Sequence, residues 1–419
     1  MGPKQLHWLY TIPMVAYGAI AWWTKALQQS VKNKLSSMHR LACRAITGAI
    51  SSTPSAALEI LLDLPPLHIY LEREARWATY RNRQLAINLP QTNIMEQNRM
   101  LEGIESHSVL GMVSDGLPVR INLDLPYNSL LPGRDEWERN RTDLLRADGC
   151  WYTDSSKTPE GAGAGVYSRR PRVEIADSLG QYATVFQAEI HATKLCGREM
   201  EKRGPNRSQA ALKALGSYRC TSKVVWNCQQ TLSRVGRTNR LTLVWIPGHV
   251  GLKGNEAADS LARRGATLEF IGPEPVLGLS YSTARSVIRT WAEGDTLEYW
   301  RGLPGLTHSK RFIPSSSKTR SKKLLELSRI NLRALVGLYT GHCRLRHHMH
   351  RIGLAEDAEC RLCMEDDETA EHVLCTCPAA DRTRFSILGK VQLMPEDLDK
   401  YSPGKIIDFL KKLELLGEV

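Results

Sequence analysis

Hydrophobic and polar residues follow patterns in the middle of the chain that predict a mixed α/β domain. Bulky and small residues alternate in residues 150–153, and a second apolar run follows the glycine-rich residues 161–165, so two strands joined by a tight turn are expected. Apolar residues then recur at helical spacing in residues 185–196, which predicts a helix. A further strand is predicted for residues 241–246, and a last helix for the segment that begins at Asn255.

Three acidic residues and one histidine stand out within these elements. Asp154 lies near the end of the first strand, Glu189 lies on the apolar face of the first helix, and Asp259 lies on the last helix. His249 lies on a loop between two glycines, and an acid on a buried face requires a partner or a metal ion. Carboxylates gathered from a strand and two helices suit magnesium, because hard cations take oxygen ligands. Two such ions can promote an in-line phosphoryl displacement.

The sequence around this central part predicts six regions. Residues 1–85 are helical, residues 86–146 are a proline-rich linker without periodicity, and residues 147–267 are the α/β domain. Residues 268–340 are a basic helical connector, and residues 341–381 bind zinc. Residues 382–419 form an amphipathic helix that packs on the chain rather than on a membrane.

The positive charge is concentrated in two of these regions. The chain carries a net charge of +12, and residues 301–351 hold 12 Lys and Arg against one acidic residue. The α/β domain, counted over residues 148–267, holds 18 basic residues against 10 acidic ones. Basicity gathered in blocks indicates a polyanionic partner, most simply nucleic acid. Lys318, Arg320, Lys322 and Lys323 are the candidate contacts to its phosphates, with a solvated basic face as the alternative.

The cysteines predict an intracellular protein with one metal centre. They are scattered singly through the first 340 residues, which is not the pattern of a disulfide framework. Near the C-terminus, Cys360, Cys363, His372 and Cys377 have the spacing of a tetrahedral zinc site, with Cys375 as the alternative to Cys377 and a cluster of free thiols as the alternative to zinc. The apolar segment from Leu6 to Trp23 is interpreted as packed helices rather than a signal or membrane segment. The nucleus and the cytoplasm are not distinguished.

The central motifs resemble the ribonuclease H domain of non-LTR (LINE-type) retrotransposon polyproteins. The similar stretches are TDSSK, FQAEIHA, SQAALKAL, WIPGHVGLKGNEAAD and LARRGA, in this order over some 120 residues. The resemblance implies a ribonuclease-H-like mixed sheet with flanking helices. It also implies two-metal cleavage of the RNA strand of an RNA–DNA hybrid by Asp154, Glu189 and Asp259 with Mg²⁺ or Mn²⁺, assisted by His249.

The two ends of the chain are similar to other parts of the same polyproteins. WLYTIPMVAYGAIAWW and HRLACRAITGAISSTPSAALEILLDLPPLHI resemble the segment after the reverse-transcriptase palm, without a polymerase site. TGHCRLRHHMHRIGL, CRLC and ETAEHVLCTCP resemble the C-terminal zinc module, in which Cys377 matches the family's last ligand. The chain therefore looks like the C-terminal part of such a polyprotein, with one structural zinc ion.

One departure from the family weakens the predicted enzyme. In the family, a strand that ends in a metal-binding Asp stands directly before the Ser208-Gln-Ala-Ala run, and here that position is Arg207. A helix is expected to begin at Ser208, and the preceding strand is expected to be missing. We therefore expect an impaired ribonuclease H that binds hybrid, or single-stranded RNA or DNA, and no small-molecule substrate. The alternatives are a nucleic-acid-binding protein that does not cut, and a zinc-organised interaction module.

Overall fold

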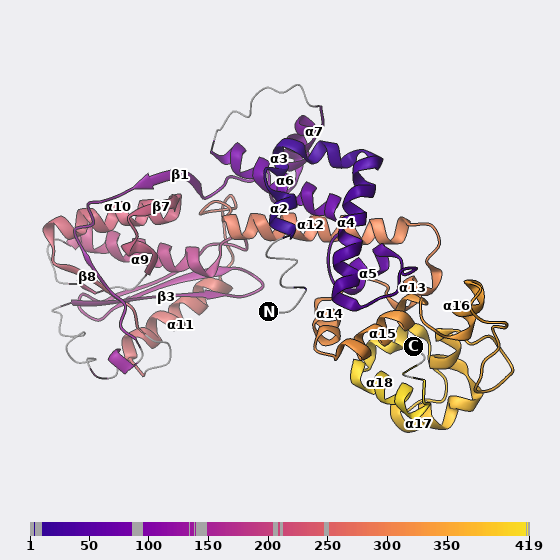
Figure 1. Cartoon of the computed structure of the whole chain (residues 1–419). Coiled ribbons are helices and arrows are strands. Elements are labelled where there is room, and N and C mark those ends of the chain that lie inside the picture. The colour runs from indigo at the N-terminus through magenta and orange to yellow at the C-terminus, as the bar shows by residue number, and fades with distance from the viewer. Residues whose placement is uncertain are drawn as a thin grey trace. The chain divides into compact units, whose positions relative to one another are not determined.

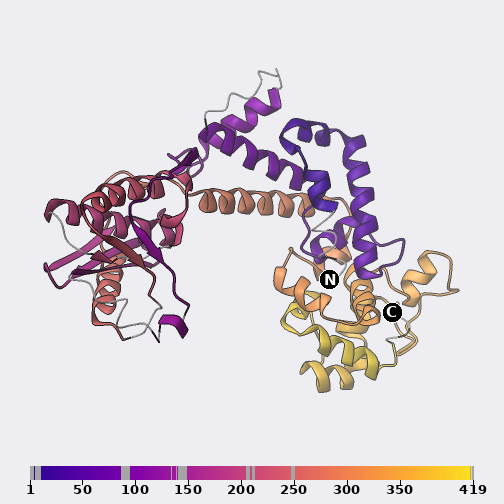
Figure 2. The same cartoon turned by 60° about the vertical axis from the view of Figure 1, so that its left-hand side comes forward.

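The computed structural model folds into two compact units (Figures 1 and 2). Unit 1 comprises residues 1–76 and 289–419, and unit 2 comprises residues 77–288. The chain passes from one unit to the other within helix α6 (Leu67–Gln84) and again within helix α12 (Tyr281–Gly302). The structure describes residues 11–85, 95–133, 135–137, 149–203, 208–209, 213–246 and 251–415, together with Lys4, Arg139 and Gly417.

A six-stranded mixed sheet forms the centre of unit 2. The strands are β2 (Asn128–Leu130), β3 (Gly149–Lys157), β4 (Ala162–Ser168), β5 (Val173–Ser178), β6 (Ser208–Gln209) and β8 (Leu241–Val244). Their order is β2-β8-β6-β3-β4-β5, in which β3, β4 and β5 pair antiparallel and the remaining neighbours pair parallel. A separate two-stranded sheet pairs β1 (Gly116–Ile121) with β7 (Arg219–Ser222).

Helices cover both faces of the large sheet. Helices α9 (Val185–Arg203) and α10 (Lys223–Thr238) pack against each other on one face, and α11 (Lys253–Thr267) lies on the other (Figure 1). The predicted strands before and after the glycine-rich run and the helices predicted near 185 and 255 are therefore confirmed as elements. The interior consists of apolar residues of the strands, α9 and α10, such as Val166, Ile190 and Leu232.

The glycine-rich run is a helix-packing surface rather than a turn. Gly163 and Gly165 lie within β4, and the turn is formed by the residues just before Ala162. A β-carbon on Gly165 would overlap the carbonyl oxygen of Ala258, and one on Gly163 would overlap the backbone of Ala266. Glycine at these two positions lets the backbone of α11 approach the strand closely.

The segment predicted to be a linker, residues 86–146, contains structured elements of unit 2. These are α7 (Met95–Ser106), β1 and β2, and they pack through residues such as Ile104 and the fully buried Trp137. Asp115, just before β1, accepts hydrogen bonds from the Ser222 hydroxyl (2.7 Å) and the Val224 amide (2.9 Å). This carboxylate therefore caps the start of α10, and the proline-rich composition did not reveal that role.

Ser208 and Gln209 do not begin a helix, which corrects the expectation for this segment. They form strand β6 between β3 and β8, where Ser208 pairs with Gly149 and with Leu241. The sequence predicted that the strand at this position of the sheet would be missing. The structure has a strand there, and its length is two residues. The short helix η3 (Lys213–Gly216) follows, and Arg207 lies outside the described residues.

Unit 1 is helical, and its N-terminal helices form a small hydrophobic cluster that is separate from its main core. Its N-terminal elements are α2 (Ile12–Ala16), α3 (Ala19–Trp22), η2 (Trp23–Leu27), α4 (Gln29–Thr47) and α5 (Ser55–Leu61). Its C-terminal elements are α13 (Thr307–Phe312), α14 (Lys318–Leu325), α15 (Arg329–Thr340), α16 (Arg346–Arg351), η4 (His372–Thr376), η5 (Pro378–Ala380), α17 (Asp381–Leu388), η6 (Pro395–Lys400) and α18 (Pro403–Lys412).

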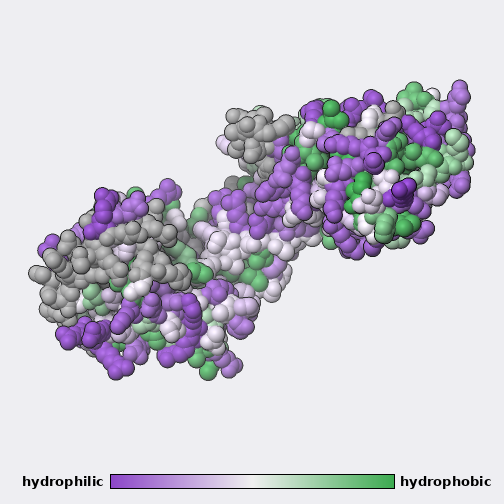
Figure 3. Space-filling model, turned by 90° about the horizontal axis from the view of Figure 1, so that it is seen from below, coloured by the Kyte–Doolittle hydropathy of each residue, from purple (hydrophilic) through white to green (hydrophobic). Residues whose placement is uncertain are grey.

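One hydrophobic core joins the three C-terminal regions that the sequence predicts separately. It contains Leu58 of α5, Leu335 of α15, Val373 beside the predicted zinc ligand His372 and Phe409 of α18. The amphipathic C-terminal helix thus packs on the chain, as its spacing predicts. In the described part of the chain no helix has both the length and the apolar character to cross a membrane, and Figure 3 shows hydrophilic side chains over much of the face seen there.

We predict that Gly165→Ala destabilises the protein, because its methyl group would overlap the α11 backbone. Overpacking of this kind costs about 1–3 kcal/mol of unfolding free energy. The matched control is Gly294→Ala in α12, where a β-carbon meets open space and alanine favours the helix by up to about 1 kcal/mol. Chemical denaturation measures both. Equal stability of Gly165→Ala and the parent protein would contradict the close packing.

Candidate functional site

Asp154 stands at the centre of the sheet, on the face that α11 covers. It lies opposite Gly165 in the β3–β4 ladder, and directly opposite residues direct their side chains to the same face. Because the Gly165 position touches the backbone of Ala258, helix α11 brings its neighbour Asp259 close to the strand that carries Asp154. Asp259 itself pairs with Arg263 one turn later, at 2.6 Å.

Glu189 reaches the same strand from helix α9. Burial is the main cause that raises the pKa of Glu189, a hydrogen bond from Ser155 opposes it, and the negative charge of Asp154 adds to it. The net pKa is about 7. At neutral pH this carboxyl group is therefore ionised only in part. A neighbouring negative charge disfavours ionisation of a carboxyl group, and a bound cation would favour the ionised form.

Asp154, Glu189 and Asp259 offer the oxygen donors that Mg²⁺ prefers. Among the described residues, however, they do not form a compact donor cluster of the kind found at Cys360, Cys363, His372 and Cys377. Glu189 contacts Ser155 and senses the charge of Asp154, whereas Asp259 pairs with Arg263. The site would have to break or share the Asp259–Arg263 ion pair. His249 and Arg207 lie outside the described residues, so the predicted roles of both positions stay predictions.

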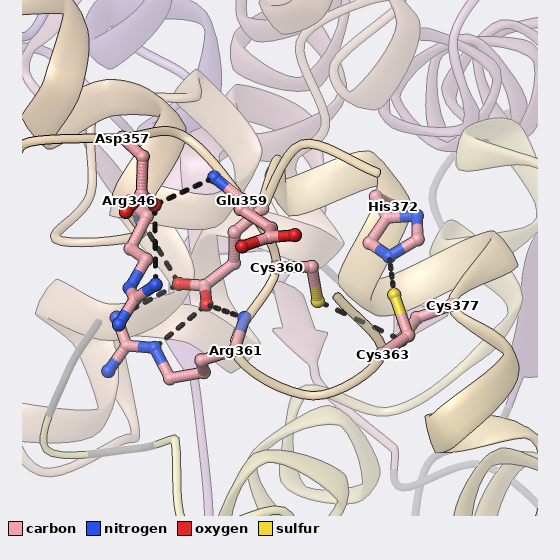
Figure 4. A network of polar contacts seen from close by, with 9 residues as sticks. Arg346, Asp357, Glu359, Cys360, Arg361, Cys363, His372 and Cys377 are labelled. Carbon is pink, nitrogen blue, oxygen red and sulfur yellow. Dashed lines mark hydrogen bonds and ion pairs between the residues drawn. The ribbon is translucent and has the colours of Figure 1, made fainter. Parts of the chain in front are cut away.

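The C-terminal cysteines and histidine come together in unit 1. The donor atoms of Cys360, Cys363, His372 and Cys377 all lie within 4.8 Å of one another. Cys360 Sγ lies 4.0 Å from Cys377 Sγ, and Cys363 Sγ lies 3.3 Å from His372 Nε2 (Figure 4). Zinc bonds of about 2.3 Å to sulfur and about 2.0 Å to nitrogen place tetrahedral ligands roughly 3.5–3.8 Å apart, so the cluster has the size of a zinc site.

The surroundings of this cluster orient its ligands. The second ring nitrogen of His372, Nδ1, lies 3.5 Å from Asp366 Oδ2, which leaves Nε2 directed at the sulfur atoms. Burial and, to a smaller extent, the neighbouring Cys360 together raise the pKa of the Cys377 thiol to about 12. Only a bound cation would therefore hold these sulfurs as thiolates. Cys375, the alternative ligand, is buried beside the cluster but does not belong to it.

A buried ion pair supports the loop that carries Cys360 and Cys363. Glu368 is fully buried and accepts from the Arg361 side chain at 2.8 Å and from the backbone of Arg346 and Arg361 at 3.1 Å each (Figure 4). The sequence analysis did not single out Glu368. Its partner Arg361 lies seven residues earlier in the sequence, but this spacing does not show whether the ion pair is buried or exposed.

Four basic residues were predicted to contact nucleic acid, and one of them has a structural role instead. Arg320 is buried, and its guanidinium lies 2.8 Å from Asp399, which holds α14 against the segment before α18. The expected phosphate contact is therefore wrong for Arg320, because the side chain is not free to reach a ligand. Lys318, Lys322 and Lys323 are exposed on α14 and stay predicted contacts.

Comparison with known proteins gives a match within the α/β domain. Residues 209–267 match the family model of RNase H, which supports a protein that contains a ribonuclease H domain. The mixed sheet with helices on both faces is consistent with that family, which typically uses Mg²⁺. The matched residues include Asp259 and His249, whereas Asp154 and Glu189 precede them. No curated protein matches the chain.

Proposed function

We propose that unit 2 is a ribonuclease H that acts on the RNA strand of an RNA–DNA hybrid, and that its activity is impaired. The observation that carries the proposal is the buried Glu189, which is hydrogen-bonded to Ser155 beside Asp154 in a domain whose C-terminal part matches RNase H. The order of the motifs in the sequence further supports an origin in a LINE-type retrotransposon polyprotein.

The chemistry follows from the carboxylates. Asp154, Glu189 and Asp259 would hold magnesium, which supplies an activated water and neutralises the charge that develops on the phosphate and the leaving oxygen. Glu189, with its raised pKa, gives up its proton as the cation binds. His249 would assist proton transfer at the leaving group. Discrimination of RNA from DNA would rest on the 2′-hydroxyl of the cut strand.

Impairment is proposed because the negative charge at the site is incomplete. Two magnesium ions bring a charge of +4, and the three carboxylates bring −3, while the family's fourth position is Arg207. One charge pair at about 4 Å is worth roughly 4 kcal/mol at an effective dielectric constant of about 20. Even after a discount for solvent, the second cation would bind far more weakly than in a complete site.

We predict that the full chain hydrolyses a labelled RNA–DNA hybrid slowly with Mg²⁺ or Mn²⁺, and that Asp154→Asn abolishes the residual turnover. Glu201→Gln on the same helix as Glu189 is the matched control, since Glu201 pairs with the exposed Arg234 outside the site, and it should leave the rate unchanged. Hybrid binding without any turnover would favour the alternative, a nucleic-acid-binding protein that does not cut. Turnover that is unaffected by Asp154→Asn would contradict the site.

We also propose that Cys360, Cys363, His372 and Cys377 hold one structural zinc ion. The observation that favours it is the size of the cluster, together with the second nitrogen of His372 facing Asp366. The ion would join the Cys360 loop to the segment that contains His372 and Cys377, and so complete one side of the core of unit 1.

We predict about one zinc per full chain by elemental analysis. Cys377→Ser should lower the occupancy strongly, because it removes a ligand, whereas Cys375→Ser should leave most of the zinc bound. Both cysteines are buried, so the second variant controls for the effect of a buried serine. Equal loss from both variants, or a parent protein without zinc, would contradict the assignment.

A further inference from the structure

A cavity lined by histidines lies in unit 1, outside both sites described above. Its volume is about 330 Å³, which is large enough for one nucleotide, and it lies between α13, the end of α15, α16 and residues 368–370. The lining residues that carry the argument are His308, His342, His348 and Arg351. None of them belongs to the predicted zinc or magnesium ligands.

A chain of hydrogen bonds fixes the protons on two of these imidazoles. Arg351 remains protonated, so its guanidinium donates to His348 Nδ1 (3.1 Å). The proton of His348 is then on Nε2, which donates to the Ser52 hydroxyl (3.3 Å). Ser52 in turn donates to His342 Nδ1 (3.1 Å), so His342 carries its proton on Nε2. The chain ends in a donor on His342, a residue that lines the cavity.

The surroundings of His342 disfavour its protonated form. Burial is the largest effect, and together with His348, Arg351, His308 and Arg40 of α4 it lowers the pKa of His342 to about 4. Burial lowers the pKa of His348 as well, with Arg351 and His347 adding to the effect. A bound anion would favour the protonated forms and raise the pKa of both imidazoles.

The acidic groups of the cavity do not supply that anion. Glu368 lines the cavity, but its carboxylate is already engaged by Arg361. Asp367 pairs with His347 Nδ1 at 3.0 Å. Arg351 donates to a neutral imidazole nitrogen, so the guanidinium charge remains available to a ligand.

We propose that this cavity binds one nucleotide of a single-stranded nucleic acid, with its phosphate held by His342 and Arg351. Phosphate is the anion that guanidinium and imidazole N–H groups recognise, and imidazole rings such as that of His308 can stack on a base. The chain's ribonuclease H domain points to nucleic acid as the source of the phosphate. The site is built entirely from unit 1, so it can exist whether or not unit 2 cuts hybrid.

Binding is linked to proton uptake by His342, and this sets its pH dependence. In the free protein His342 is neutral above its pKa of about 4, and the bound phosphate raises that pKa. Affinity therefore rises as the pH falls, by at most tenfold per pH unit for each proton taken up. The rise extends from the pKa of the bound state down to the pKa of the free state.

The test measures binding of a labelled single-stranded oligodeoxynucleotide to the full, zinc-loaded chain between pH 7.5 and pH 5.5. His342→Ala should weaken binding at pH 5.5 by about tenfold and reduce the pH dependence by up to one proton. His350→Ala is the matched control, because His350 is an exposed histidine of α16, the helix that carries His348 and Arg351, and lies outside the cavity lining. It should behave as the parent protein.

Modification by diethyl pyrocarbonate gives a second measurement that needs no variant. The oligonucleotide should protect His342 and leave His350 reactive, as read by mass spectrometry. Protection of His342 by inorganic phosphate at high concentration would support the same anion site. Equal affinities and pH dependences of the two variants, or protection of His342 by Zn²⁺ but not by the oligonucleotide, would overturn the proposal.

Discussion

The close approach of helix α11 to strand β4 is the constraint on which the candidate catalytic site depends. Gly163 and Gly165 leave no side chain between the helix and the sheet, so the backbone of α11 lies against the strand next to β3. Asp259 is fixed on that helix, and Asp154 is fixed on β3. A methyl group at Gly165 would push the two apart, because protein interiors are too closely packed to absorb it.

Some charged side chains of the protein form ion pairs that stabilise the fold, whereas other ionisable groups have surroundings that disfavour their charged forms. Arg320 and Arg361 are neutralised by Asp399 and by the buried Glu368, and these pairs hold the helices and loops of unit 1 together. By contrast, burial and the charge of Asp154 raise the pKa of Glu189, and burial and nearby positive groups lower the pKa of His342. Groups whose charged forms are disfavoured in this way are typical of sites that a ligand of opposite charge completes.

The sequence predicted the elements whose signals are local. The alternation in residues 150–153, the helical spacing around Glu189 and the spacing of Cys360, Cys363, His372 and Cys377 all lie within short stretches of chain, and the corresponding elements or clusters are present. The resemblance to ribonuclease H is supported, for the C-terminal part of the domain, by the match over residues 209–267.

The failures involve contacts between residues far apart in the sequence. Strand β2 has three residues and is paired with β8 more than a hundred positions later, and β6 has two residues, so neither shows a periodicity. Arg320 was predicted to be a surface residue because its partner, Asp399, stands 79 positions away. The glycines of β4 looked like a turn, since no local pattern reveals a helix packing on them.

The central claim is the proposal that Asp154, Glu189 and Asp259 form a ribonuclease H site that lacks one carboxylate. Comparing the rate of hybrid hydrolysis of Arg207→Asp with that of the parent tests it most directly. The control is Arg237→Asp, the same charge reversal at an exposed residue of α10 that pairs with Asp124. The account predicts that Arg207→Asp raises the rate at least about tenfold, which corresponds to about 1.4 kcal/mol, and that the control does not. Equal rates for all three proteins would contradict it.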